Sequence, residues 1–342
     1  MNKIKWILTT LILVTLVSCS KSTTNTVTPP PVDTTGGTDN SQYLAGWRYF
    51  DSAHINPFVT DIYAADPSAH VWADGRLYVY PSHDIDPPKG CNLMDQYHVY
   101  STSDMVNWTD HGEILRASQV NSPQYPGTSE GTFMWAPDCA YKNGTYYFYF
   151  PHAVDSPWNT NWKIGVATSS QPASNFTFQK YIDGLESLID PCVFVDDDGQ
   201  AYLYYGGGGV CKGGKLKDNM MEIDGAMQPM TGLQDFHEAT WVHKRNGTYY
   251  LSYADNYSGT NKGNQMRYAT SKSPLGPWLA RGVYLESTTS STDHGSIVQF
   301  KGRWYAFYHN SAISHFDWLR SICVDTLGYT SDGLIKKVIQ TN

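Results

Sequence analysis

The chain of 342 residues is 41% hydrophobic and 14% aromatic and contains 29 glycines, which indicates a large folded domain with many tight turns and excludes a disordered protein. Its 24 lysines and arginines stand against 32 acidic residues, a formal net charge of -8, and the basic residues form no cluster. This excess of acid argues against a protein that binds nucleic acid or an anionic membrane surface.

Residues 1-18 have the pattern of an export signal. Lys3 and Lys5 precede a short apolar run that is too short to cross a bilayer. The run ends in Leu-Val-Ser-Cys19, which resembles the lipobox of bacterial lipoproteins, so we expect Cys19 to carry a lipid; an ordinary cleaved signal is the alternative. Residues 19-46 are rich in Ser, Thr, Pro and Gly and are expected to form a flexible, lipid-anchored linker.

The predicted location is therefore the bacterial cell envelope, with the lipid as the only attachment to a membrane. The residues after the lipobox lack the acidic run that can direct a lipoprotein to the cell surface, which favours the periplasmic side. The remaining cysteines are odd in number and lack the spacing of a metal site, so we expect no disulfide framework, although one pair can form in an oxidising envelope. They are Cys91, Cys139, Cys192, Cys211 and Cys323.

A pattern of ten residues recurs five times along the rest of the chain. In each copy the first residue stands nine positions before a glycine, and a short aromatic strand follows the glycine. Each copy is typical of a β-hairpin, and five copies indicate a repeat architecture. The copies span residues 66-75, 135-144, 190-199, 238-247 and 293-302.

Further strand-like stretches lie between these hairpins, for example residues 96-101 and 163-168, so each repeat holds about four short strands in roughly 60 residues. Repeats of this size form either an open solenoid or a closed ring. A ring removes the exposed strand edges, and it tolerates long unequal insertions such as residues 83-95. The sequence therefore predicts an all-β fold, a five-bladed β-propeller with four-stranded antiparallel blades, over residues 47-342.

Three copies of the pattern begin with a carboxylic acid: Asp66, Asp190 and Glu238. The innermost strand of every propeller blade faces the central channel, so the three acids are expected to meet at one end of it. Like charges in a partly buried site raise each other's pKa and cost stability. Hydrolysis of a glycosidic bond needs carboxyl groups close together, because one carboxyl protonates the leaving oxygen and another activates water or attacks the sugar.

A structural explanation exists for some of these acids. The Asp-Pro dipeptide fits a turn at Asp66 and Asp190, whereas Glu238 opens an apolar strand and has no turn role. Asp138 also lies inside a repeat but is shifted three places from the equivalent position, so we expect it to be structural.

The same residues carry a resemblance to a known family. The chain resembles glycoside hydrolase family 43, a group of five-bladed propellers that cleave furanosides and xylosides of plant polysaccharides with inversion. The resemblance covers about residues 47-340, nearly the whole predicted domain. It rests on Asn56-Pro, Ala65-Asp66-Pro67-Ser68, Trp135-Ala-Pro-Asp138, Asp190-Pro and the turn ending at Gly199, Glu238-Ala, and His294-Gly-Ser-Ile-Val298.

The resemblance implies a role for each acid. Asp66 is expected to be the general base that activates water, and Glu238 the general acid that protonates the leaving oxygen. Asp190 is expected to raise the pKa of the proton donor and to hold its orientation. Arg320 falls near the family's substrate-binding arginine and is expected to bind the sugar in the cleavage pocket, a surface ion pair being the alternative.

The resemblance also implies that His294 lies on the axis of the channel. There it is expected to contact substrate and to lie near a bound calcium or other cation; a channel histidine without a metal is the alternative, because one imidazole is a poor calcium ligand set. No cofactor is expected to be required. The fifth copy carries Asp293 where the family usually has glycine, which leaves the metal site open.

Aromatic side chains suit the apolar faces of sugars. Trp135 and Phe58 stand near the inner ends of their strands and are expected to form part of the wall of the substrate pocket. Glu130, in the loop before Trp135, either lines the pocket or is solvated.

These observations favour an inverting, exo-acting glycosidase that removes terminal α-L-arabinofuranose from plant-type oligo- or polysaccharides, because long loops between blades tend to close a pocket around a chain end. A β-xylosidase, a galactofuranosidase and an endo-arabinanase are alternatives within the same chemistry. A retaining, fructosidase-type propeller fits the sequence around the acids less well. A non-catalytic carbohydrate-binding propeller would not require three acids in register.

Overall fold

The computed structural model describes residues 56–85, 94–120, 133–154, 160–259 and 263–341. The predicted signal peptide, Cys19, the linker over residues 19-46 and Glu130 lie outside the described residues. No helix in the described part of the chain is long and apolar enough to span a membrane.

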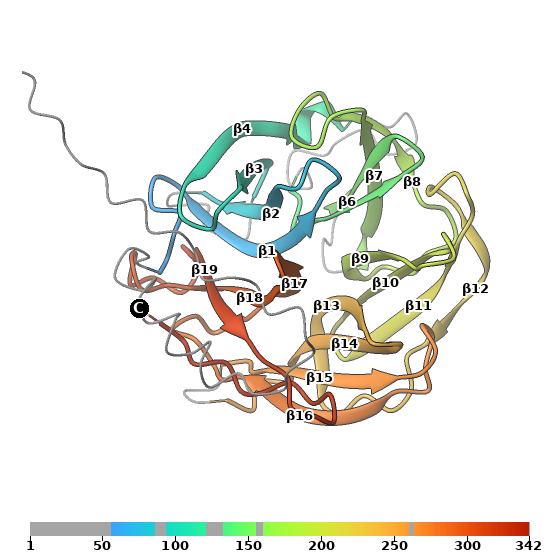
Figure 1. Cartoon of the computed structure of the whole chain (residues 1–342). Coiled ribbons are helices and arrows are strands. Elements are labelled where there is room, and N and C mark those ends of the chain that lie inside the picture. Colours follow the sequence, from blue (N-terminus) through green and yellow to red (C-terminus); the bar gives the residue numbers. More distant parts are fainter. Residues whose placement is uncertain (1–55, 86–93, 121–132, 155–159, 260–262, 342) are drawn as a thin grey trace, which may run out of the picture. The chain divides into compact units, whose positions relative to one another are not determined.

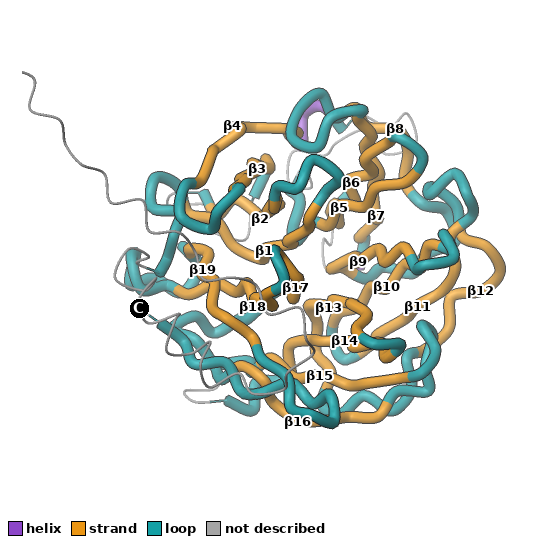
Figure 2. Tube along the Cα trace, viewed as in Figure 1, coloured by secondary structure: helices purple, strands orange, loops and turns teal. Residues whose placement is uncertain are grey.

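Five antiparallel sheets follow one another around a common centre (Figure 1 and Figure 2). Within each sheet the strands are neighbours in chain order, so every blade is a simple meander. Four sheets have four strands, and the fifth has three within the described residues. The prediction of an all-β, five-bladed propeller is confirmed.

The strands have the following bounds. The first blade contains β1 (Tyr63–Val71), β2 (Leu77–Asp84), β3 (Gln96–Thr102) and β4 (Trp108–Arg116), followed by the short 3-10 helix η2 (Ala117–Gln119). The second contains β5 (Asp138–Lys142), β6 (Thr145–Ala153), β7 (Trp162–Ser169) and β8 (Thr177–Tyr181). The third contains β9 (Ile189–Val195), β10 (Ala201–Gly207), β11 (Val210–Leu216) and β12 (Ile223–Pro229). The last two contain β13 (Phe236–Arg245), β14 (Thr248–Asp255), β15 (Met266–Ser271) and β16 (Leu279–Leu285), then β17 (Ser296–Phe300), β18 (Arg303–Asn310) and β19 (Ser321–Leu327).

The segment that precedes β1 lies against the last strand of the fifth blade. The backbone N–H of Phe58 donates to the carbonyl of Ile322 at 3.1 Å. The side-chain amide of Asn56 exchanges two hydrogen bonds with the backbone of Val324, both at 3.0 Å. The two ends of the domain are thereby joined, which closes the ring of blades.

The glycine of each repeated pattern occupies a hairpin turn between the first two strands of a blade. All five glycines have a positive φ, between 68° and 83°, a conformation that costs glycine little and other residues more. In three turns the preceding residue has a positive φ as well, as a type I′ turn requires. These residues are Asn143, Asn246 and Lys301.

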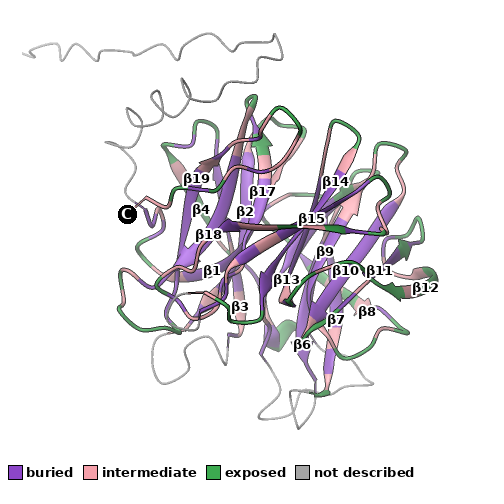
Figure 3. Ribbon diagram, turned by 90° about the horizontal axis from the view of Figure 1, so that it is seen from below, coloured by how far each residue is buried: buried purple, intermediate pink, exposed green. Residues whose placement is uncertain are grey.

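The hydrophobic core lies between neighbouring blades. Tyr80 and Phe148 belong to the cluster between the first and second blades, and Val79 and Phe307 to the cluster that packs the fifth blade on the first. Figure 3 shows that burial runs along the strands, while exposed residues gather at the turns. Four cysteines of the described part are buried and free, and Cys91 lies outside it; the four are Cys139, Cys192, Cys211 and Cys323.

Hydrogen bonds also join the first strands of all five blades around the centre. The first strands of the blades lie around the middle of the ring (Figure 1), so each bond links one blade to the next. The bonds run from Ser68 Oγ to Asp138 Oδ1 (2.5 Å), Val193 N to Asp138 Oδ2 (2.6 Å), Val242 N to Cys192 Sγ (3.2 Å), Trp241 Nε1 to Ile297 O (3.0 Å) and Ala69 N to Ser296 Oγ (3.0 Å). The centre is therefore a fixed frame for any side chain that points into it.

Candidate active site

Each of the three predicted catalytic acids lies at a β-bulge in the first strand of its blade. Asp66 and Asp190 have φ angles of 51° and 52°, and Ala239, directly after Glu238, has a φ of 65°. The strand register shifts at all three places. A bulge inserts an extra residue and changes the direction of the local side chains, and such strained residues gather at functional sites. The side chains of the acids therefore do not follow the regular alternation of side-chain directions along their strands.

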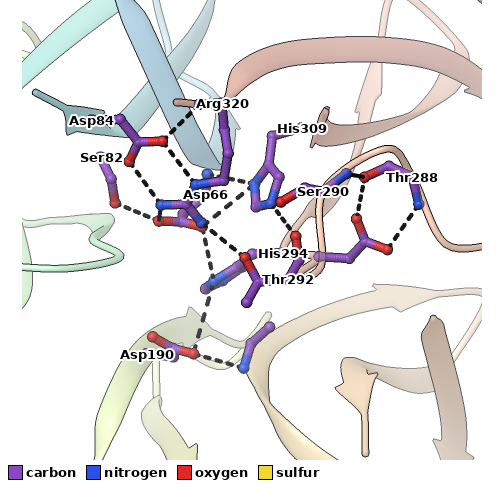
Figure 4. Close-up of polar contacts among 12 residues, drawn as sticks. Asp66, Ser82, Asp84, Asp190, Thr288, Ser290, Thr292, His294, His309 and Arg320 are labelled. Atoms are coloured by element: carbon purple, nitrogen blue, oxygen red, sulfur yellow. Dashed lines mark hydrogen bonds and ion pairs between the residues drawn. The ribbon is translucent and has the colours of Figure 1, made fainter. Parts of the chain in front are cut away.

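The carboxylate of Asp66 is buried and accepts three hydrogen bonds (Figure 4). It accepts a hydrogen bond from Ser82 Oγ at 2.7 Å and one from each terminal nitrogen of Arg320, at 2.9 and 3.3 Å. Burial alone would raise the pKa of Asp66, but Arg320, the histidines His309 and His294, and the Ser82 hydrogen bond outweigh it and lower the pKa to about 2. Asp66 is therefore ionised at physiological pH, as a base must be.

Arg320 lies between two buried carboxylates, Asp66 and Asp84. Its Nε and Nη2 bind Asp84 at 2.9 and 2.8 Å, and its backbone N–H donates to the same carboxylate at 2.8 Å. Its Nη1 donates to Asp66 and, at 3.4 Å, to Thr292 Oγ1. A guanidinium has five N–H donors, and these contacts engage all five. The structure thus places Arg320 as a clamp on Asp66, and its predicted contact with the sugar stays a prediction.

Two histidines flank Asp66. The Nδ1 of His309 accepts the backbone N–H of Asp66 at 3.1 Å, so its Nε2 carries the proton and donates to the carbonyl of Thr292 at 2.6 Å. The Nδ1 of His294 lies 3.9 Å from Asp66 Oδ1 and 3.8 Å from Asp190 Oδ2, between the two acids (Figure 4). Burial lowers the pKa of His309 to about 3 and that of His294 to about 4, so both rings are neutral at physiological pH.

Asp190 and Glu238 are linked through the backbone of the fourth blade. Asp190 Oδ2 accepts the backbone N–H of Ala239 at 2.8 Å, which fixes the bulge that carries Glu238. Burial, with the charges of Glu238 and Asp66, raises the pKa of Asp190 well above its ordinary value. Burial likewise raises the pKa of Glu238, whose side chain is 20% exposed with Oε2 3.6 Å from His237 Nε2. Glu238 therefore combines access to solvent with a raised pKa, which favours its protonated form.

The two aromatic residues predicted to form the pocket wall, Trp135 and Phe58, lie in different environments. Trp135 is partly exposed and packs on Trp162 at 4.6 Å between ring centroids, in a cluster with Ile189, the residue before Asp190. The hydroxyl of Tyr97, itself under the influence of the charges of Asp66 and Asp190, donates to the carbonyl of Trp135 at 2.6 Å. Trp135 thus borders the acids.

Phe58 has a different environment. Its ring stacks on Trp108 of β4 at 4.1 Å and meets Phe307 of β18 edge-on at 6.1 Å. These neighbours belong to the core cluster between the fifth and first blades. Phe58 therefore packs the first blade on the last, and none of these contacts brings it to the acids.

The remaining acids of the repeats have structural partners. Asp138 accepts hydrogen bonds from the first and third blades and lies 2.7 Å from His70 Nε2, which fits the predicted structural role. Asp293 is buried and accepts hydrogen bonds from the hydroxyl and backbone N–H of Thr288, at 2.7 and 3.2 Å. Burial raises the pKa of Asp293 to about 8. The acid of the fifth copy is thus neutral and turned toward the loop before β17.

Few side chains near His294 could bind the predicted cation. Among the described residues, no group of three or more His, Cys, Asp or Glu side chains is placed to hold a metal ion. Calcium prefers six to eight oxygen ligands, and the imidazole of His294 supplies one nitrogen. The residues present therefore do not form a calcium site, and we derive no chemical step from a metal.

Sequence analysis missed four residues of the site. Ser82 and Asp84 follow the aromatic strand of the first copy, and His309 ends that of the fifth. The second strand of a hairpin ends beside the start of the first, so polar residues at this point lie level with the acids. Thr292 directly precedes the first position of the fifth copy. Position in the repeat was thus a usable signal for all four.

The opposed protonation states of two of these acids indicate a class of enzyme. Hydrolysis of a glycosidic bond needs one carboxylate and one carboxylic acid, and their surroundings must push the two pKa values apart. Arg320 holds Asp66 ionised, while burial raises the pKa of Glu238. The fold and the site thus define a propeller glycosidase.

The chain belongs to the glycosyl hydrolases family 43, whose family model matches residues 55–335. It is 38% identical to xylosidase/arabinosidase 43A of Humicola insolens over 82% of this chain and 98% of that protein. It is 34% identical to a xylosidase/arabinosidase of Bacteroides ovatus over 80% of this chain and 94% of that protein. The chain is therefore a glycosidase that spans nearly the whole length of these relatives.

Solved structures of family 43 enzymes are also similar to this chain. A family 43 β-xylosidase/α-arabinofuranosidase from a compost microbial metagenome, solved with xylotriose in a calcium-free form, superimposes with a TM-score of 0.74 at 35% identity. The alignment covers 83% of this chain and 97% of that one. An α-L-arabinofuranosidase of Clostridium thermocellum gives a TM-score of 0.66 at 34% identity, over 83% and 96% of the two chains.

Proposed function

We propose that the protein is an inverting, exo-acting glycosidase that removes terminal arabinofuranosyl and xylosyl residues from plant xylan and its oligosaccharides. The observation that carries the reaction is the contrast between Asp66, with a pKa of about 2, and Glu238, with a raised pKa. The choice of sugar is supported by relatives named xylosidase/arabinosidase and by a similar structure that contains xylotriose.

In the proposed reaction, Asp66 orients a water molecule that attacks the anomeric carbon. As the new C–O bond forms, the water oxygen becomes strongly acidic, and its proton passes to Asp66 even though this carboxylate is a weak base. The bond to the leaving oxygen breaks at the same time, and Glu238 donates its proton to that oxygen. The products are a sugar with inverted configuration and a shortened chain.

Asp190 acts on this reaction through Glu238. Its carboxyl group accepts a hydrogen bond from Ala239 N–H, which fixes the bulge on which Glu238 stands. Trp135, which packs in a cluster with Ile189 directly before Asp190, is expected to cover the sugar in the pocket. Asp190 is therefore a positioning residue, because it acts through the proton donor.

The test is release of sugar from aryl arabinofuranoside, xyloside and galactofuranoside, with the anomer of the product followed by NMR. Wild-type protein is expected to cleave the first two with inversion. Glu238→Gln is expected to lower kcat on unactivated oligosaccharides by about 100-fold or more while leaving oligosaccharide binding intact. Glu222→Gln, on the exposed β11–β12 turn, is the matched control. Wild-type protein that binds oligosaccharides but cleaves none refutes the proposal, and a retained anomer refutes the inverting mechanism.

We further infer that a lipid on Cys19 holds the enzyme in the bacterial cell envelope, on the periplasmic side. The support is the lipobox-like sequence at residues 16-19 and the polar linker after it. Cys19→Ala is expected to move the protein from the membrane fraction to the soluble fraction and to abolish labelling by a radioactive fatty acid. Unchanged labelling of the variant would contradict a lipid at this residue.

A further inference from the structure

The loop between β18 and β19, residues 311-320, exposes two large aromatic side chains and ends at Arg320, which binds Asp66. Phe316 is 55% exposed and Trp318 is 50% exposed, and their ring centroids lie 6.3 Å apart. The next two residues, Leu319 and Arg320, are buried. The two rings thus project from the segment that ends at the Asp66 clamp.

Hydrogen bonds hold this loop in one shape. Ser314 Oγ accepts the backbone N–H of Phe316 at 2.9 Å and donates to the carbonyl of Leu319 at 2.6 Å. Asp317 lies between Phe316 and Trp318 in the chain, and its carboxylate accepts the backbone N–H of Ser291 at 2.5 Å. Exposing two aromatic rings on an ordered loop sacrifices hydrophobic burial, which indicates a surface that binds something.

The anchor of the loop belongs to the active site. Ser291 directly precedes Thr292, whose hydroxyl and carbonyl accept hydrogen bonds from Arg320 and His309. Figure 4 shows Thr292 and Arg320 beside Asp66, with Ser290 beyond His309 next to Thr288. The loop is thus fixed to the same frame as the general base.

A third exposed aromatic residue extends this surface toward the general acid. The ring of Tyr257, 40% exposed, lies 4.8 Å from that of His237, and His237 lies 3.6 Å from Glu238. The charges of Glu238 and Asp317 both act on the Tyr257 hydroxyl, where they add to burial in raising its pKa. Tyr257 therefore lies within electrostatic range of both the proton donor and the loop. We call Tyr257, Phe316 and Trp318 the aromatic strip.

We propose that the aromatic strip binds the part of the substrate that leaves, a chain of β-1,4-linked xylosyl residues. This inference rests on the proposed function, in which Glu238 protonates the leaving oxygen, so the leaving chain departs from the side of Glu238. In xylo-oligosaccharides and in arabinoxylan alike, the leaving part is a xylan backbone. A xylopyranose ring lacks an exocyclic CH₂OH group, so its flat C–H faces stack closely on aromatic rings.

The strip predicts how activity depends on chain length. Tyr257 lies nearest the proton donor and is expected to contact the first leaving sugar, while Phe316 and Trp318 contact sugars farther along. Removing Trp318 is therefore expected to harm long substrates and to spare short ones.

The experiment compares kcat/KM on xylobiose and xylohexaose, each substituted with arabinofuranose if that is the sugar that the wild-type enzyme releases. Trp318→Ala is expected to lower kcat/KM about tenfold on the hexasaccharide and less than twofold on the disaccharide. Tyr141→Ala removes an aromatic side chain, 39% exposed, near the β5–β6 turn of another blade, and is expected to change neither value. Titration calorimetry of Glu238→Gln and Glu238→Gln/Trp318→Ala with xylohexaose gives the same comparison without turnover.

Equal losses on both lengths, or no loss on either, overturn the inference and leave the proposed function intact, because the enzyme still cleaves. A wild-type protein that cleaves neither substrate refutes the proposed function itself. A second copy of the chain is the other possible occupant of the aromatic strip, and light scattering tests it. If the wild type is a dimer at assay concentration and Trp318→Ala is a monomer, the strip is an interface between two copies and the inference is wrong.

Discussion

Replacing Arg320 by methionine tests how the general base is kept ionised. Arg320 is the cation that binds Asp66, and the same guanidinium binds the buried Asp84. Methionine keeps much of the side-chain volume and removes the charge and all five donors. Burial then raises the pKa of Asp66 with only the two histidines and the Ser82 hydrogen bond left to oppose it.

The size of the effect follows from the pKa of Asp66. It lies at about 2 instead of the ordinary 3.8, a difference of 3.8 - 2 = 1.8 units. At 1.36 kcal/mol per unit this corresponds to about 2 kcal/mol. Because the folded-state pKa is depressed, this stability is present above pH 3.8 and is lost as the pH falls toward 2. The variant loses this contribution and in addition carries two unpaired buried acids, a cost of about 3–5 kcal/mol.

The assay is the pH profile of kcat/KM together with urea unfolding at pH 6 and pH 3. In the variant, the acidic limb of the profile is expected to move upward by about two units or more. Arg281→Met, on β16 away from the acids, is the control. If Arg320 served only to bind the sugar, the variant would have a higher KM and an unmoved limb. An acidic limb that stays in place would refute the conclusion that Arg320 sets the ionisation of Asp66.

Two other substitutions test the neighbouring parts of the argument. Asp190→Ala removes the acceptor of the Ala239 N–H, so the bulge that carries Glu238 is expected to lose its fixed position and kcat to fall by about 100-fold; an unchanged kcat would contradict this positioning role. Gly165→Ala places a Cβ 2.5 Å from the ring of the fully buried Phe150, and is expected to lower the free energy of unfolding by about 1–3 kcal/mol in a denaturant titration. An unchanged unfolding midpoint would show that the core between the blades yields without cost.

Much of the architecture was present in local sequence patterns. The spacing of nine residues to a glycine marked all five hairpins, because a turn with positive φ strongly favours glycine at that place. The first position of the pattern gave Asp66, Asp190 and Glu238 as a group, because equivalent positions of a closed repeat converge on its axis. Trp135, the first residue of the second copy, came to border Asp190 for the same reason.

Other features depended on contacts between residues far apart in the chain. Phe58 had the sequence context of a pocket residue, yet closure of the ring packs it on Trp108 and Phe307. The pattern also gave no sign that Arg320 pairs with Asp84, which lies 236 positions away.

The sequence by itself determined the repeat, its turns and the three acids, since each depends on residues within ten positions of one another. Only the tertiary structure decided the protonation state of each acid. The pKa of a carboxyl group depends on its burial and on the charges beside it, and these come from other blades. Arg320 in the last blade keeps Asp66 in the first ionised, while burial raises the pKa of Glu238.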